Sequence, residues 1–141
     1  MATSRPELPG WIADHIKAYL ETDGADGHMW RGVPTLLLTT TGRRSGEPIL
    51  LPLIYGTDGP NYLVVASKGG APANPGWYEN LVKSPAVEVQ VGADKFKARA
   101  RTATAAEKPA LWEKMAAIWP AYIEYQQKTS RDIPVVVIER S

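Results

Sequence analysis

The chain has 141 residues, the length of one ordinary domain with a real hydrophobic core. Its 16 basic and 15 acidic residues leave a formal net charge of +1, so no overall charge attracts nucleic acid. The absence of cysteine excludes disulfides, thiolate catalysis and sulfur-bound metals. No apolar run approaches the roughly 18 residues of a membrane span, and no apolar signal core opens the chain. We therefore expect a cytoplasmic protein that acts on a small molecule.

The amino-terminal region predicts one amphipathic helix over residues 11–20. Its apolar residues recur at helical spacing: Trp11, Ile12, Ile16, Tyr19 and Leu20. Residues 23–32 are rich in glycine and acid, which indicates a mobile connection. We accordingly divide the single domain into residues 1–32, a helix with a flexible connection, and residues 33–141, which carry the cofactor. Weak peripheral membrane contact through this helix is a second option.

A β-hairpin is expected next. Residues 35–41 and 49–55 are apolar and β-branched, and Gly42-Arg43-Arg44-Ser45-Gly46 stands between them as the tip. Pro52 inside the second strand indicates an edge or a bulge, because proline donates no ladder hydrogen bond. Residues 57–60 read as a turn.

The remaining strands and helices follow in short alternation. Strands are expected over residues 62–66, 87–91, 96–101 and 133–138. Asn74 and Pro75 predict an N-cap and a first helical residue for a helix over residues 76–83. Thr104 and Glu107 form a capping-box pattern that opens a helix to about residue 119, and Pro120 starts another through about residue 129.

This pattern predicts an α+β, β-rich fold of about six mostly antiparallel strands with short covering helices. Closure of the strands into a barrel would remove exposed sheet edges. The strands and helices do not alternate regularly, which argues against a doubly wound parallel sheet.

Three constellations could carry chemistry. The hairpin tip offers two guanidinium groups and a hydroxyl suited to phosphate or carboxylate, although a solvated basic turn has the same pattern. Ser67-Lys68-Gly69-Gly70 ends a buried strand, where ligands often bind, although a plain glycine connection also fits. Trp119, Tyr122 and Tyr125 share one helical face, as core residues or as a wall for a flat substrate.

Hydrolytic and metal-dependent chemistry finds no support in the sequence. There is no Gly-x-Ser-x-Gly motif, and His15 and His28 have no metal-ligand spacing, so surface or capping roles are expected for both. General acid-base residues are not evident either, which indicates that a cofactor supplies the difficult step.

Three blocks, in this order along the chain, resemble the deazaflavin-dependent nitroreductase family of actinobacteria. The blocks are residues 38–46, residues 66–81, and residues 119–134 with Trp119-Pro120-Ala121-Tyr122 and Arg131-Asp132-Ile133-Pro134. The resemblance runs from about residue 34 to residue 139. It implies a split β-barrel like that of FMN-binding oxidoreductases, with reduced coenzyme F420 as hydride donor to a quinone, an activated enone such as a coumarin lactone, or a nitroaromatic.

The resemblance also implies residue roles. Arg43, Arg44 and Ser45 would meet the phospholactyl and oligoglutamate tail of F420, and Thr41 and Gly42 beside them would also bind the cofactor. The deazaflavin ring and ribityl chain would be held by Ser67, Lys68, Gly69, Asn74, Pro75, Gly76 and Trp77. Further cofactor contacts are expected at Pro52, Ala66 and Asn80. Trp119, Tyr122 and Tyr125 would wall the substrate side, and Ser67 would orient the substrate. Trp119 stands where the family pattern has tyrosine, which bears on the substrate range.

Two other functions remain open from the sequence. An FMN-binding split-barrel oxidoreductase could use the same phosphate grip for another ring. A non-catalytic F420 carrier would have the aromatic stripe as core. The sequence leaves the oligomeric state as monomer or homodimer.

Overall fold

A computed structural model describes residues 10–30 and 32–141; the Trp11 side chain and its predicted packing lie outside this description. Helix α1 spans Gly10–Glu21, which confirms the predicted amino-terminal helix. Its Tyr19 is fully buried. Residues 22–28 form hydrogen-bonded turns, and the short strand β1, Met29–Trp30, follows.

The hairpin forms as predicted. Strand β2, Val33–Thr41, pairs antiparallel with β3, Pro48–Ile54, in register from Thr35 opposite Ile54 to Thr41 opposite Pro48. Among the described residues β3 hydrogen-bonds only to β2, so the prediction that Pro52 lies on an edge strand is confirmed.

The other elements lie close to their expected positions. Strands β4 and β5 span Gly56–Asp58 and Asn61–Val65. A short 3-10 turn, η1, Lys68–Gly70, precedes helix α2, Gly76–Lys83. Strands β6 and β7 span Ala86–Val91 and Asp94–Thr102. Helices α3, Lys108–Ile118, and α4, Ala121–Gln127, lead to β8, Val135–Arg140.

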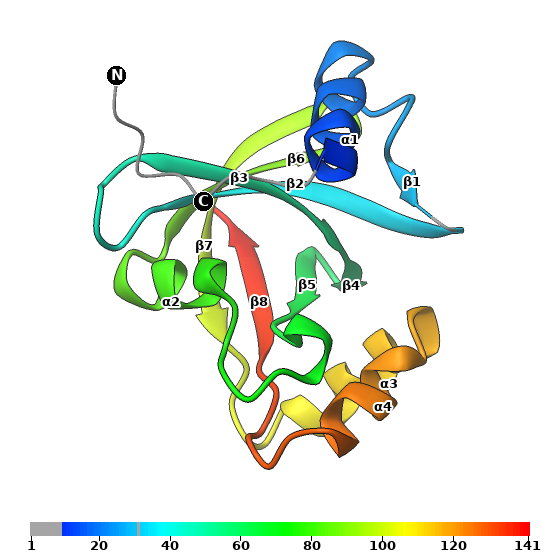
Figure 1. The fold of residues 1–141 in the computed structure, drawn as a ribbon, viewed down its shortest axis with the longest axis vertical. Coiled ribbons are helices and arrows are strands. Elements are labelled where there is room, and N and C mark those ends of the chain that lie inside the picture. The colour runs from blue at the N-terminus through cyan, green and yellow to red at the C-terminus, as the bar shows by residue number, and fades with distance from the viewer. Residues whose placement is uncertain (1–9, 31) are drawn as a thin grey trace.

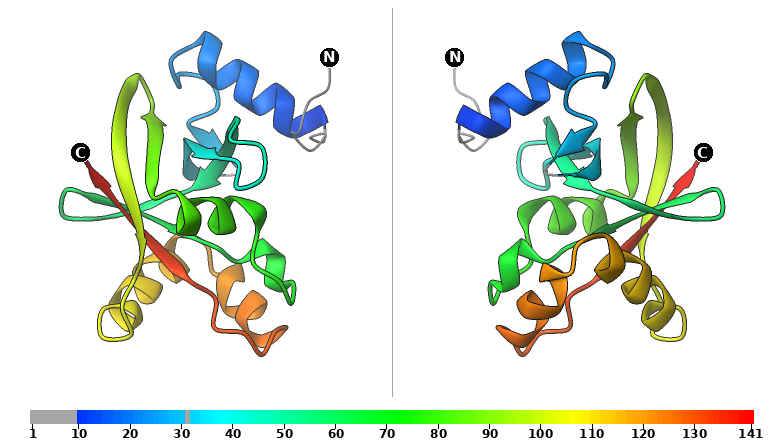
Figure 2. Two further views of the ribbon diagram at one scale, coloured as in Figure 1. Left: turned by 90° about the vertical axis from the view of Figure 1, so that its left-hand side faces the viewer. Right: turned by 90° about the vertical axis from the view of Figure 1, so that its right-hand side faces the viewer.

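All strand pairs found in the described part of the chain are antiparallel, and they form one curled sheet in the order β1-β2-β6-β7-β8-β5-β4, with β3 beside β2. Figure 1 shows β2 and β3 above and β5 and β8 below, with α1 over the upper strands and α3 and α4 at the opposite end. The two side views of Figure 2 show the same curl. The architecture is the expected split barrel.

Two of the observed strands were not predicted. β1 is two residues long and β4 is three, so neither is long enough to display a two-residue alternation. The interpretation of residues 57–60 as a turn is wrong for Thr57 and Asp58, which pair with Tyr62 and Asn61 in a tight hairpin.

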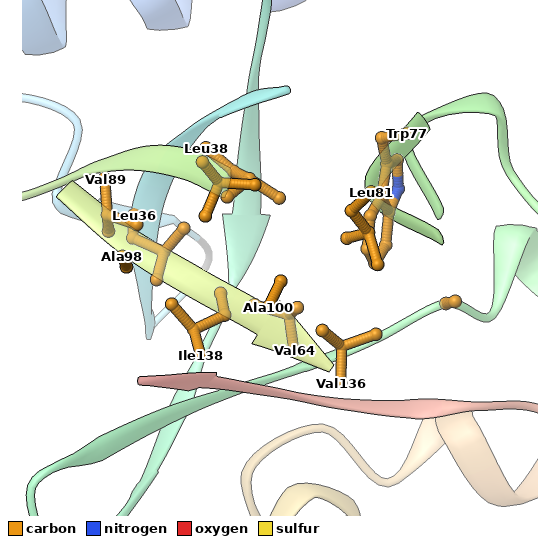
Figure 3. Packing of buried hydrophobic residues seen from close by; sticks show 12 residues of the cluster. Leu36, Leu38, Val64, Trp77, Leu81, Val89, Ala98, Ala100, Val136 and Ile138 are labelled. Carbon is orange, nitrogen blue, oxygen red and sulfur yellow. The ribbon is translucent and has the colours of Figure 1, made fainter. Parts of the chain in front are cut away.

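The core has two layers, separated by strands whose faces are both buried. Val136 and Ile138 of β8 face α2 and the inside of the curled sheet, whereas Val135 and Val137 face α3 and α4. This alternation explains why β5 and β8 read as continuous apolar runs. In Figure 3, Trp77 and Leu81 of α2 point toward the apolar side chains of the inner layer.

The capping-box prediction at α3 is confirmed. The Thr104 N–H donates to Glu107 Oε1 over 2.8 Å, and the Glu107 N–H donates to Thr104 Oγ1 over 3.3 Å. Within the described residues, no helix is both long enough and apolar enough to span a bilayer.

Candidate functional site

An aromatic cavity of about 380 Å³ lies beneath α1, between β3, the end of β5 and α4. It is lined by Ile12, His15, Trp30, Thr35, Leu51, Pro52, Leu53, Ile54, Val65, Ser67, Lys68, Gly69, Pro75, Trp77, Trp119, Tyr122 and Tyr125. Aromatic and aliphatic side chains dominate this lining, and a few polar groups converge on it. Such a composition suits a flat organic ring.

The loop after β5 enters the cavity with an unusual backbone. Lys68, Gly69 and Gly70 all have positive φ, at 47°, 64° and 85°. Left-handed backbone is easy for glycine and costs about 1 kcal/mol for a residue with a Cβ such as Lys68. Gly70 is required for a further reason, because a Cβ there would lie 2.6 Å from the Tyr125 carbonyl oxygen. The loop thus packs directly on α4.

The predicted N-cap role of Asn74 is wrong. The residue that precedes α2 is Pro75, and it makes no side-chain cap. Asn74 Oδ1 instead accepts a hydrogen bond from Arg131 Nη1 over 2.8 Å. A guanidinium is a stronger donor than a backbone N–H, and it draws the Asn74 side chain away from the helix.

The three aromatic residues at α4 belong to the cavity and to the core at the same time. Trp119 follows α3 directly, and its ring centroid lies 5.7 Å from that of Trp30. Tyr122 is 5% exposed and contacts Tyr125 edge-on at 6.2 Å. Burial, with a smaller contribution from Tyr125, raises the pKa of Tyr122 well above the usual tyrosine range. Its phenol therefore stays neutral and keeps its proton.

A second cavity, the basic groove, has a volume of about 460 Å³ and lies between the hairpin tip and α2. It is lined by Gly42, Arg43, Arg44, Ser45, Ile49, Leu51, Lys68, Pro75, Gly76, Trp77 and Asn80. Three of these residues are cationic and none is acidic. The groove therefore favours an anionic ligand.

The tip is shaped by its glycine and by α2. A Cβ at Gly42 would lie 2.6 Å from Ser45 Oγ, so only glycine fits there without a shift of the serine. Arg43 donates to Asn80 Oδ1 from both its backbone N–H, over 3.1 Å, and its Nη1, over 2.9 Å. Lys83 Nζ donates to the Arg43 carbonyl over 2.7 Å. Arg44 remains exposed at the groove.

The two cavities adjoin. Leu51, Lys68, Pro75 and Trp77 line both of them. Together they form one trough, aromatic at the α4 end and cationic at the hairpin end.

Comparisons with known proteins agree with this geometry. A sequence model of the F420H(2)-dependent quinone reductase family matches residues 11–140. An F420H(2)-dependent quinone reductase of Mycobacterium tuberculosis is 41% identical over 135 residues, which cover 89% of this chain and 87% of that protein. The chain belongs to the F420H(2)-dependent quinone reductase family. Reduced coenzyme F420 is accordingly its hydride donor, and the protein is an oxidoreductase.

Two solved structures support the membership. One, described as a domain-swapped dimer, is 38% identical with a TM-score of 0.73 and covers 92% of this chain and 97% of its own. The other is an F420-H2 dependent reductase, FDR-A, 40% identical with a TM-score of 0.70, covering 75% of this chain and 94% of its own. Both confirm the split-barrel fold of the family.

The trough fits the F420 expected in this family. Its aromatic end matches the flat deazaflavin, and its cationic end matches the phosphate and carboxylates of the tail. The junction offers open space, because a Cβ at Gly69 would meet no protein atom within 4 Å and one at Gly76 would meet only Arg43 Nη1, at 3.6 Å.

Most of the sequence-predicted site residues line the trough, and three do not. Thr41 ends β2, opposite Pro48. Ala66 is fully buried, and Asn74 is hydrogen-bonded to Arg131. None of these three lines either cavity.

The amino-terminal region supplies one wall of the aromatic cavity, which the sequence did not predict. Ile12 and His15 of α1 and Trp30 of β1 line the aromatic cavity. His15 is half-buried, with Nε2 2.6 Å from the Gly27 carbonyl oxygen, so the expectation of a surface or capping role is wrong. The periodicity that predicted α1 contained no sign of which partner the helix covers. The inner face of α1 packs against the protein's own sheet and lines the aromatic cavity.

Proposed function

We propose that F420 lies lengthwise in the trough, with its ring in the aromatic cavity and its tail in the basic groove. The observation that carries this proposal is the junction of the two cavities at Lys68, Pro75 and Trp77. An aromatic site and a cationic site that share one wall suit a single ligand with a flat end and an anionic end.

The tail is assigned to the hairpin tip. Arg44 is exposed and lines the groove, so it can form charge-assisted hydrogen bonds to phosphate or carboxylate. Arg43 has less freedom, because Asn80 already fixes its guanidinium. Ser45 contributes its hydroxyl, while Thr41 and Gly42 set the shape of the tip.

The ring and ribityl chain are assigned to the loop of residues 66–77 and to Pro52 of β3. Ser67 and Gly69 line the aromatic cavity, and Lys68, at the junction, reaches both cavities. The loop makes its turn between the two cavities with left-handed backbone at Lys68. Trp77 of α2 is 8% exposed and forms part of the wall of both cavities.

The substrate is assigned to the space between Ser67 and α4, where Trp119, Tyr122 and Tyr125 form an aromatic wall. A quinone is flat and electron-poor, and it fits against such a wall. Reduced F420 supplies a hydride when bound, and with one proton from solvent the quinone becomes a hydroquinone. The protein contributes close approach and exclusion of water, while the Ser67 hydroxyl orients the quinone oxygen. Activated enones and nitroaromatics are flat electrophiles of similar shape and form a second substrate class.

A second copy of the chain is the proposed protein partner, because the related structure at 38% identity is a domain-swapped dimer. Light scattering during size-exclusion chromatography tests this assembly. A homodimer is the expected result, and a monomer at all concentrations would contradict it.

One assay tests the proposed function. The purified protein is mixed with reduced F420 and menadione, and the return of the oxidised deazaflavin absorbance is followed. We expect turnover that saturates in both substrates. Binding of F420 without turnover would instead identify a carrier, and activity with FMN alone would identify a flavin enzyme.

A further inference from the structure

Arg131 lies between α4 and β8, outside the lining of both cavities, and binds four acceptors of one loop. Its Nη2 donates to the Ser67 carbonyl over 2.7 Å and its Nε to the Ala71 carbonyl over 2.9 Å. Its Nη1 donates to Asn74 Oδ1 over 2.8 Å and to the Ala66 carbonyl over 3.3 Å. All four acceptors belong to residues 66–74.

This loop needs such support. It contains the left-handed Lys68, whose φ of 47° is unfavourable for a residue with a Cβ. A guanidinium presents five donors in a rigid fork and can satisfy several carbonyls at once, which an ammonium group cannot do in one plane. Arg131 therefore determines how the loop leaves β5.

Arg131 is also tied to the helix on the other side of the cavity. Gln126 of α4 donates from Nε2 to the Arg131 carbonyl over 2.7 Å and accepts the Ile133 N–H at Oε1 over 2.9 Å. Gly70 packs against the Tyr125 backbone of the same helix. Arg131 thus connects the loop that carries Ser67 with the helix that carries Tyr122 and Tyr125.

We propose that Arg131 is a positioning residue for hydride transfer, which sets the distance between the ring-side loop and the substrate-side helix. The inference rests on the proposed function, since it assumes that Ser67 and Gly69 hold the deazaflavin ring. Hydride transfer depends steeply on near-attack geometry, and a displacement of about 1 Å can lower a rate about 100-fold. Arg131 acts through the loop and touches neither ligand itself.

The test compares Arg131→Lys with Arg140→Lys. Arg140 ends β8, pairs with Asp94 and lies over the Phe96 ring, and it lines neither cavity. Lysine keeps the positive charge at either position and removes the planar set of guanidinium donors. Measurements are the F420 dissociation constant by fluorescence, the single-turnover rate with menadione at saturation, and the isotope effect with F420 deuterated at the transferred hydrogen.

For Arg131→Lys we expect a cooperative thermal transition and a single-turnover rate lowered about 10- to 100-fold. The isotope effect on steady-state turnover should rise, because the hydride step becomes more rate-limiting. Arg140→Lys should stay within about twofold of the wild type. A folded Arg131→Lys protein that is as fast as the wild type overturns the proposal. So does a loss of single-turnover rate that is fully explained by the unfolded fraction of the variant.

A second variant keeps the proposal testable if Arg131→Lys does not fold. Asn74→Ala removes one of the four acceptors and leaves Arg131 in place, so the rate should fall by a smaller factor, about two- to fivefold. An unchanged rate in this variant contradicts the proposal. Failure of the wild type to bind or oxidise reduced F420 would refute the proposed function itself, and the two failures are therefore distinguishable.

Discussion

Asn80 Oδ1 accepts two hydrogen bonds from Arg43, one from the backbone N–H and one from the guanidinium. Asn80 is 2% exposed, and its Nδ2 donates in turn to Thr40 Oγ1 over 3.2 Å. One buried amide on α2 therefore fixes both the path of the hairpin tip and the direction of its first arginine.

Replacement of this amide should affect stability and binding together. Asn80→Leu leaves the part-buried Arg43 N–H without its acceptor, which should lower the free energy of unfolding by about 1–3 kcal/mol. Chemical denaturation measures this loss, and F420 titration should show weaker binding because Arg43 is no longer held. The control is Gln127→Ala, at the exposed end of α4, which should change stability by less than about 0.5 kcal/mol. Equal stabilities for both variants would contradict the role of Asn80.

Some elements were predictable because local chemistry determines them. The burial of both faces of β5 and β8 follows from their continuous apolar runs, and the hairpin tip follows from paired glycines around two arginines. The capping box between Thr104 and Glu107 needs only a four-residue pattern. These features depend on neighbours in the sequence, so periodicity and spacing suffice to predict them.

Other features depend on distant partners and left no local signal. Asn74 has the residue type of an N-cap, yet its oxygen binds Arg131, 57 residues away in the chain. His15 lines the cavity because α1 is held against the sheet by distant contacts, among them the bond that the Gly92 N–H donates to the Tyr19 hydroxyl over 2.7 Å. Tertiary contacts of this kind override local preference, and periodicity cannot indicate them.

Trp119 should control the quinone more than the cofactor. Trp119→Ala removes one wall of the aromatic cavity together with the ring contact to Trp30. An aromatic pair contributes about 0.5–1.5 kcal/mol, so KM for menadione should rise up to about tenfold. The F420 dissociation constant should stay within about twofold. Trp119→Tyr keeps an aromatic ring, so KM for menadione should rise less in this variant. An unchanged KM in Trp119→Ala would refute the assignment of Trp119 to the substrate wall.

Tyr122 should make the protein sensitive to alkali. Burial raises its pKa in the folded state above the ordinary value of about 10, so the unfolded chain ionises first as pH rises. Its contribution to stability is full below about pH 10 and is lost as pH rises toward the folded-state pKa. Denaturant titrations at several pH values should show that the free energy of unfolding falls less with rising pH for Tyr122→Phe than for the wild type.

A smaller alkaline loss should remain in Tyr122→Phe, because burial also raises the pKa of Tyr19 and Tyr55. Identical pH dependence in the wild type and in Tyr122→Phe would show that the Tyr122 phenol ionises freely. That result would contradict its placement in the core.

The orientation of the cofactor is the central claim, and Arg44 gives the most direct test of it. Fluorescence titrations would measure the binding of F420, and of a deazaflavin without the phospholactyl and glutamate tail, to the wild type and to Arg44→Glu. The matched control is Arg99→Glu, which changes the same charge at an exposed position of β7 that lines neither cavity.

If the tail lies in the basic groove, Arg44→Glu should weaken F420 binding about tenfold at low salt, equivalent to about 1.4 kcal/mol, and by less at high salt. The tail-less deazaflavin should bind both proteins alike, and Arg99→Glu should bind F420 as the wild type does. Equal weakening of both ligands by Arg44→Glu, or no weakening of either, would contradict the proposed orientation.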